Sequence, residues 1–172
     1  MEEGFQNKIS VRKGDGLEVL APGEADCITI AGMGGTLISS ILERGKEKLV
    51  GTKRLVLQPN IQAINIRKWL HSNDWDLIAE TILEEDGKIY EILVAEKGNG
   101  KAAYSEKKES ELLLGPFLMK ECSDVFRKKW QAELKHWKHI IEQLEKSGKT
   151  ESSQEKQEQL KRNIAIVEEA LS

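Results

Sequence analysis

The chain has 172 residues, of which 39% are hydrophobic and 32% charged, and its formal net charge is −3. This length allows one ordinary domain with an appendage, and the composition is that of a soluble protein. No apolar run is long enough to span a bilayer, and Met1-Glu2-Glu3-Gly4 does not resemble the start of a signal peptide. We therefore expect neither a membrane span nor a secretory signal, and the total charge does not by itself indicate a nucleic-acid partner.

The cysteine content points to a reducing compartment. Cys27 and Cys122 lie far apart and form no disulfide framework. We expect a cytoplasmic protein with two free thiols.

The first elements are short. Residues 8–13 alternate polar and apolar side chains and end at Gly14-Asp15-Gly16, which predicts a strand followed by a turn. Residues 2–7 have the pattern of a helix tail that precedes this strand. Residues 17–20 predict one helical turn.

Two buried strands are predicted at residues 26–31 and 54–58, because each is a short apolar run that stops at glycine or proline. A helical pattern follows each strand. This alternation predicts a parallel α/β sheet with right-handed crossovers and helices on both faces.

The two crossover helices are predicted from apolar spacing. In the first, Leu37 and Ile41 lie on one face. Asn60 is placed to cap the second helix, residues 61–72. Its expected buried side chains are Ile61, Ile64, Trp69 and Leu70.

An antiparallel hairpin should complete the sheet. Residues 75–84 and 88–96 are strand-like and are separated by Glu85-Asp86-Gly87, a strong turn signal. Gly98-Asn99-Gly100 then marks a candidate boundary. We expect a partial Rossmann-like domain over residues 1–98 and a helical domain over residues 105–172.

The helical domain shows two apolar stripes separated by a polar break at residues 147–153. They predict two long helices that pack as an antiparallel coiled-coil hairpin. The stripes repeat at spacings of three and four residues and comprise Met119, Cys122, Phe126, Trp130, Leu134, Trp137, Ile141 and Leu144, then Leu160, Ile164, Val167 and Leu171.

Three motifs follow predicted strands, and open α/β sheets bind their ligands at such strand ends. The motifs are Gly14-Asp15-Gly16, Gly32-Met33-Gly34-Gly35 and Gln58-Pro59-Asn60. Gly32-Met33-Gly34-Gly35 keeps the rim of the sheet clear and opens a helix, so it suits a phosphate, a carboxylate or a flat ring, or forms only a tight turn. It is not a dinucleotide fingerprint, because Leu37 stands where the third glycine belongs and Gln58 where an acidic residue belongs. Nor is it a phosphate loop, since no Gly-Lys-Ser/Thr follows.

Side chains near this rim match an adenine ring. The Asp15 carboxylate can accept a hydrogen bond from an exocyclic amine, or serve only to turn the chain. Gln58-Pro59-Asn60 offers amides that match the adenine edge, although Asn60 is equally suited to capping.

Lysines on the first long helix are candidates for contacts with RNA phosphates. They are Lys128, Lys129, Lys135 and Lys138, and Trp130 and Trp137 are interspersed among them. The alternative is a solvated helix face. His136 and His139 are too few for a metal site, so we expect no metal.

Four segments occur in a characteristic order and spacing: Asp26 to Ile38, Leu57-Gln58-Pro59-Asn60, Glu84 to Ile92 and Leu114-Gly115-Pro116. In these segments, and over essentially the whole chain, the sequence resembles the bacterial tRNA (adenine-22-N1)-methyltransferase family, TrmK. The resemblance implies a class I methyltransferase (Rossmann-like) sheet with a C-terminal coiled coil and a cytoplasmic enzyme that methylates adenine N1 at position 22 of tRNA with S-adenosyl-L-methionine.

The resemblance also assigns roles by position. Asp15 and Gly16 correspond to the turn that binds the cofactor's adenine, and Ala31, Gly32, Met33 and Gly34 to the floor shared by the cofactor and the target base. Gln58, Pro59 and Asn60 are candidates near the target base, with no catalytic residue assigned. We expect a monomer when complete.

The family also places a strand, a glycine-containing cofactor loop and a second strand before residue 8. We expect this βαβ unit of about 30 residues or more to be absent, so that the sheet is N-terminally incomplete, which puts the activity of the isolated chain in doubt. The alternatives are a non-catalytic tRNA-binding or RNA-binding module, which would bind tRNA but not S-adenosylmethionine, and a nucleotide-dependent oxidoreductase.

Overall fold

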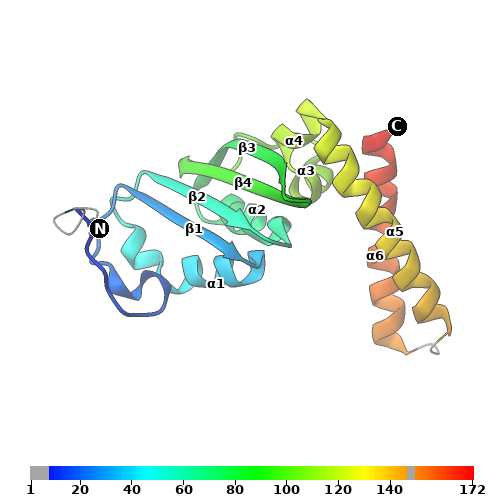
Figure 1. Cartoon of the computed structure of the whole chain (residues 1–172), viewed down its shortest axis with the longest axis horizontal. Coiled ribbons are helices and arrows are strands. Elements are labelled where there is room, and N and C mark those ends of the chain that lie inside the picture. Colours follow the sequence, from blue (N-terminus) through cyan, green and yellow to red (C-terminus); the bar gives the residue numbers. More distant parts are fainter. Residues whose placement is uncertain (1–7, 147–149) are drawn as a thin grey trace.

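The computed structural model describes residues 8–146 and 150–172, which form a four-stranded sheet followed by a long helical hairpin (Figure 1). The helix tail predicted at residues 2–7 lies outside the described residues, and so does part of the predicted polar break, residues 147–149. No helix within the described ranges combines the length and apolarity needed to cross a membrane.

The sheet is mixed and its strands lie in the order β1-β2-β4-β3. β1 (Cys27–Met33) and β2 (Arg54–Pro59) are parallel, and β4 (Lys88–Lys97) is antiparallel to both β2 and β3 (Trp75–Glu85). The predicted hairpin is confirmed, because Asp86 and Gly87 have φ values of 49° and 72° and form its two-residue turn. The predicted parallel pair is confirmed as well.

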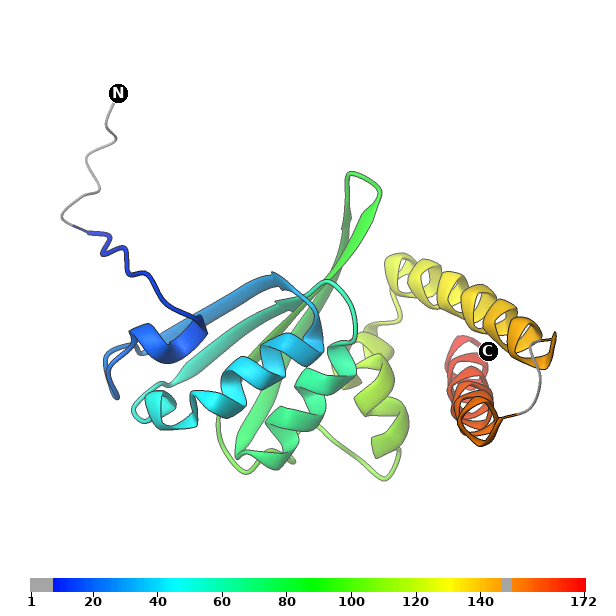
Figure 2. The same cartoon turned by 90° about the horizontal axis from the view of Figure 1, so that it is seen from below.

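Helices α1 (Gly35–Arg44) and α2 (Ala63–Ser72) lie on the same face of the sheet (Figure 2). Buried Ile28 and Ile30 alternate with exposed Cys27 and Thr29, which shows that β1 has one covered face. The prediction that helices cover both faces is therefore wrong for the described residues. The strand order explains this, since both crossovers step in one direction along the sheet, and crossovers that follow the right-handed rule then place their helices on one side.

Residues 8–13 do not form a strand, contrary to the prediction. Their backbone pairs with no described strand, and Val11 is 92% exposed. Alternation alone stabilises a strand only when its apolar side chains have a surface to cover. Arg12 instead pairs with Glu24 and donates to the Val19 carbonyl.

Two predicted helix faces are also corrected. Leu37 is exposed, and Ile38 takes its place in the core beside Ile41. α2 begins at Ala63 after Gln62, so Asn60 is not its cap, and the later start rotates the buried face. Ile61 is consequently exposed and Ile64 partly buried, whereas Trp69 and Leu70 are buried as predicted.

The predicted short turn is the 3-10 helix η1 (Gly16–Val19), and a second, η2 (Lys46–Leu49), precedes β2. After the sheet come α3 (Lys108–Leu114) and α4 (Pro116–Glu121), followed by α5 (Asp124–Lys146) and α6 (Glu151–Leu171). The two long helices are confirmed, and they pack through Trp130 and Val167. Met119 and Cys122 precede α5, because Cys122 has a left-handed backbone that ends α4.

A buried network of charges joins these parts. Arg67 of α2 has no exposed side-chain surface, and its Nε donates to Glu80 Oε1 of β3 at 2.6 Å. Its Nη2 donates to Glu91 Oε2 of β4 at 3.2 Å, and its Nη1 to the Leu113 carbonyl of α3 at 3.2 Å. Lys129 of α5 also donates to Glu91. We call Arg67, Glu80, Glu91 and Lys129 the Arg67 network.

The charges in this network depend on one another. Burial by itself raises the pKa of Glu91, but the positive charges of Arg67 and Lys129 outweigh it and hold the pKa below its usual value. Glu80 also accepts the backbone N–H of Phe117, the second residue of α4. α2, both strands of the hairpin, α3, α4 and α5 thus meet at one set of side chains.

Replacing Arg67 with Met should leave two buried carboxylates without their shared cation. Breaking a buried pair in this way lowers the free energy of unfolding by about 3–5 kcal/mol. Lys107→Met is the matched control, because Lys107 pairs with Glu169 at the surface and should change stability by less than about 0.5 kcal/mol. Urea unfolding of both variants measures the difference, and equal midpoints would contradict a stabilising role for the network.

Candidate functional site

The ends of β1 and β2 lie side by side, as predicted, and three residues there form a closed set of hydrogen bonds. The Gly32 N–H donates to Gln58 Oε1 at 2.9 Å, and Asn60 Nδ2 donates to the Gly32 carbonyl at 2.9 Å. Gln58 Nε2 donates to Asn60 Oδ1 at 3.3 Å. We call Gly32, Gln58 and Asn60 the amide ring.

The amide ring fixes two side chains that otherwise rotate freely. Each amide nitrogen carries two hydrogens, and these bonds use one from each. A second donor therefore remains on both Gln58 and Asn60, in positions set by the strand ends. A fixed pair of donors suits a planar heterocycle with acceptor atoms on its edge.

Glycine is needed at two positions of this rim, for different reasons. Gly32 has φ of +78°, which glycine adopts readily, and a Cβ there would meet open space. At Gly35 a Cβ would lie 2.1 Å from the Gln62 carbonyl oxygen. The close approach also allows the Gly35 N–H to donate to the Ile61 carbonyl at 2.8 Å. α1 and the segment after β2 are therefore in backbone contact.

Gly35→Ala should disturb this backbone contact, since the added methyl group meets main-chain atoms rather than a movable side chain. We expect a decrease of about 1–3 kcal/mol in the free energy of unfolding. Gly34→Ala is the control, because its Cβ would meet only Ile61 Cγ1 at an ordinary 3.7 Å and its φ of −70° suits alanine. Thermal unfolding of the two variants separates them, and equal decreases would contradict the close approach.

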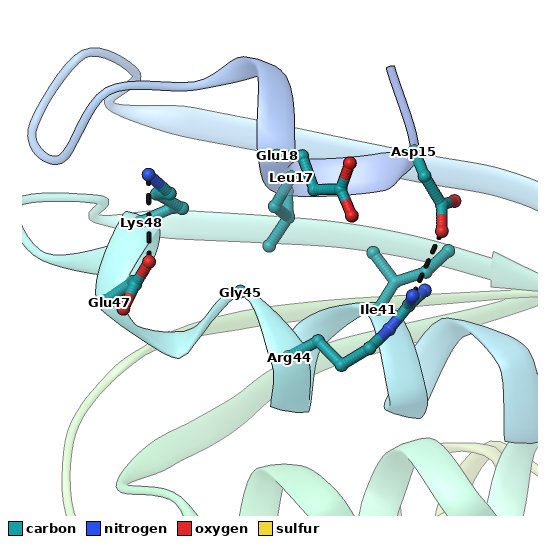
Figure 3. A pocket seen from close by; sticks show the side chains of 8 residues that line it. All are labelled: Asp15, Leu17, Glu18, Ile41, Arg44, Gly45, Glu47 and Lys48. Carbon is teal, nitrogen blue, oxygen red and sulfur yellow. Dashed lines mark hydrogen bonds and ion pairs between the residues drawn. The ribbon is translucent and has the colours of Figure 1, made fainter.

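Asp15 lies beside α1, where it faces Arg44 (Figure 3). Its Oδ2 accepts a hydrogen bond from Arg44 Nη1 at 3.0 Å, and both side chains are more than half exposed. They border a small cavity of about 100 Å³, in which Leu17 and Ile41 form the apolar part of the lining. The Asp15 carboxylate is thus held by an arginine.

Other predicted cofactor residues share one hollow. Gly16, Ala31 and Met33 line a space of about 390 Å³ along the edge of β1 that faces away from β2. No described strand pairs with this edge. The hollow is mostly apolar, with Ile28 and Ile30 in its lining.

A third cavity, of about 260 Å³, is bordered by Asn60 of the amide ring. We call it the α5 cavity. Its lining comes from the segment after β2, from the β3–β4 hairpin and from α5, and comprises Pro59, Asn60, Ile61, Gln62, Ala63, Gly87, Ile89, Glu91, Lys129, Ala132 and Glu133. The places of Glu133 and of the hairpin in this lining are not predictable from the sequence, because no local pattern shows where a distant helix crosses a sheet.

The four predicted RNA-binding lysines are not equivalent. Lys128 pairs with Glu84 at 2.6 Å, Lys138 with Glu168 at 2.7 Å, and Lys129 belongs to the Arg67 network. Lys135 is exposed and has no ion-pair partner within the described ranges. His136 and His139 are exposed, and the part of the chain that the structure describes holds no cluster of three side chains able to bind a metal.

Comparison with known proteins finds one family. The profile of the tRNA (adenine(22)-N(1))-methyltransferase family, TrmK, matches residues 1–169. A Bacillus subtilis protein of that name is 52% identical over 171 residues, which cover 99% of this chain and 72% of the relative.

Solved structures give the same result. The crystal structure of the B. subtilis M1A22 tRNA methyltransferase TrmK superposes with a TM-score of 0.90 over 98% of this chain and 73% of that chain. A Streptococcus pneumoniae putative tRNA (m1A22) methyltransferase, solved in complex with S-adenosyl-L-methionine, is 44% identical with a TM-score of 0.66, over 86% of this chain and 60% of that one.

Proposed function

The chain belongs to the tRNA (adenine(22)-N(1))-methyltransferase family, and from this premise we propose how its residues serve methylation of adenine N1 in tRNA. The observation that carries the proposal is the amide ring, which holds two amide side chains at the strand ends where such sheets bind ligands. Family membership sets aside the oxidoreductase alternative.

The methyl donor is S-adenosyl-L-methionine, the ligand named for the S. pneumoniae relative. The residues fit such a group, since the position of a Gly32 Cβ is open and the hollow along β1 accepts an apolar surface. We propose that Gly16, Ala31, Gly32, Met33 and Gly34 line its site and that Asp15 binds its adenine amine in competition with Arg44. When bound, the cofactor supplies an electrophilic methyl group.

We propose that the main role of the protein is to hold the target adenine with N1 facing the methyl group. N1 carries a lone pair in neutral adenine, so the reaction needs positioning more than a base or a Lewis acid. A target adenine that is paired or stacked in the tRNA must first be extruded from the RNA helix, which costs a few kcal/mol. We propose that Gln58 and Asn60 orient the extruded base with their second N–H groups while Pro59 contacts its ring. In this account the protein acts in the cytoplasm as a monomer without a metal.

The direct test is methyl transfer to a tRNA transcript with labelled S-adenosyl-L-methionine, followed by digestion and mass spectrometry of position 22. We expect 1-methyladenosine there and none in a transcript with guanine 22. Asn60→Ala should lower the rate about tenfold or more, as for a hydrogen bond of about 1.5 kcal/mol. Asn99→Ala is the control, because Asn99 accepts only a local backbone N–H far along the chain. Binding of tRNA without transfer would instead support the non-catalytic alternative.

The lysines of α5 give a separate test of RNA binding. Replacing Lys128, Lys135 and Lys138 with Gln removes three charges but leaves the Arg67 network intact. We expect weaker tRNA binding and a flatter dependence on salt, with a change in slope of somewhat under one unit for each phosphate that is no longer neutralised. Lys156→Gln with Lys161→Gln on α6 is the control. An unchanged salt slope in filter binding would mean that these lysines do not hold the RNA backbone.

A further inference from the structure

The α5 cavity adjoins the amide ring through Asn60, and α5 forms one of its walls. Its volume of about 260 Å³ is slightly below the usual range for small-ligand pockets, about 300–1,000 Å³. Apolar side chains and a few polar groups line it together. This combination suits one flat, polar-edged ring.

Ile61 contributes an exposed apolar side chain to this cavity. It is 66% exposed, although it directly follows the amide ring in sequence. Its Cγ1 lies 3.7 Å from the position of a Gly34 Cβ, so the side chain stands at the rim of the sheet. An aliphatic group exposed beside the expected position of the base offers a surface for packing against that base.

Glu133 contributes a carboxylate to the lining of this cavity. Its side chain is partly buried in the α5 cavity, and no hydrogen bond or ion pair to it occurs among residues 8–146 and 150–172. Glu91 also lines the cavity, but both of its oxygens are occupied, by Arg67 and by Lys129. Glu133 therefore supplies a carboxylate acceptor without a partner among the described residues, and the Arg67 network holds α5 in place through Lys129.

We infer that the α5 cavity binds the extruded adenine, with Ile61 packed against the ring and Glu133 accepting a hydrogen bond from the N6 amine. This inference rests on the proposed function and deepens it. Adenine presents an amine donor at C6, whereas guanine presents a carbonyl acceptor that a carboxylate repels. The same carboxylate favours the positive charge that the base carries once N1 is methylated.

The test pairs Glu133 with the amine it is assigned to bind. Two tRNAs are compared in filter binding, one with adenine and one with purine riboside at position 22, which lacks the amine. The unsubstituted chain should prefer adenine about tenfold, and Glu133→Ala should abolish the preference by weakening only the adenine tRNA. Glu142→Ala, on the exposed part of α5, should keep the preference.

Ile61 has a matched control as well. Ile61→Ser should weaken binding of both tRNAs several-fold, whereas Val50→Ser, at a site 64% exposed and distant from the rim, should leave both unchanged. Because Ile61 is mostly exposed and Glu133 has no hydrogen bond or ion pair among the described residues, urea unfolding should show little change in either variant.

The outcomes separate the two claims. Failure of the unsubstituted chain to bind the adenine tRNA overturns the proposed function and this inference together. Binding and methylation with no preference for adenine over purine riboside, or a preference that survives Glu133→Ala, overturns the inference and leaves the function standing. Equal behaviour of Ile61→Ser and Val50→Ser overturns the packing role of Ile61.

Discussion

The buried guanidinium of Arg67 is the constraint on which the arrangement of this molecule depends. A charged group without exposed surface is stable only when its partners surround it, and here two carboxylates and a main-chain carbonyl do so. Each partner comes from a different element. Satisfying one charge therefore fixes α2, both strands of the hairpin and α3 relative to one another.

The network reaches the candidate site through Glu91 and Lys129. Both residues line the α5 cavity, while their ion pair connects β4 to α5. The cavity beside the amide ring is thus bounded by elements that the buried charges hold in place. In this account the helical hairpin is more than an appendage to the sheet, because its first helix forms one wall of the site for the target base.

The sequence predicts the local features well and the long-range ones poorly. Apolar runs ending at glycine or proline indicate β1 and β2, and Asp86-Gly87 indicates the hairpin, because each signal lies within a few residues. Gly32 and Gln58-Pro59-Asn60 are predicted to lie together for a related reason, since strand ends of a parallel pair must meet. The strand predicted at residues 8–13 does not form, because a strand needs a neighbouring strand to pair with, and a local sequence pattern does not show whether one is present.

Arg67, Glu80 and Glu91 carry no signal of their own. Because 32% of the residues in this chain are charged, nothing in the sequence distinguishes these three from the others. Only the packing of α2 on the hairpin removes them from solvent. Glu133 gives no signal either, because its surroundings depend on where α5 crosses the rim. The exposure of Ile61 follows from the start of α2 at Ala63 rather than at residue 61.

In this structure the buried charges should make the sheet and the start of α5 one cooperative unit. Native-state hydrogen exchange of the unsubstituted chain measures that coupling. We expect the amides of Leu55, Leu93 and Trp130 to open with the same free energy, close to that of global unfolding. An opening free energy at Trp130 that is several kcal/mol lower than at Leu55 and Leu93 would show that α5 detaches on its own. That result would contradict a single cooperative unit.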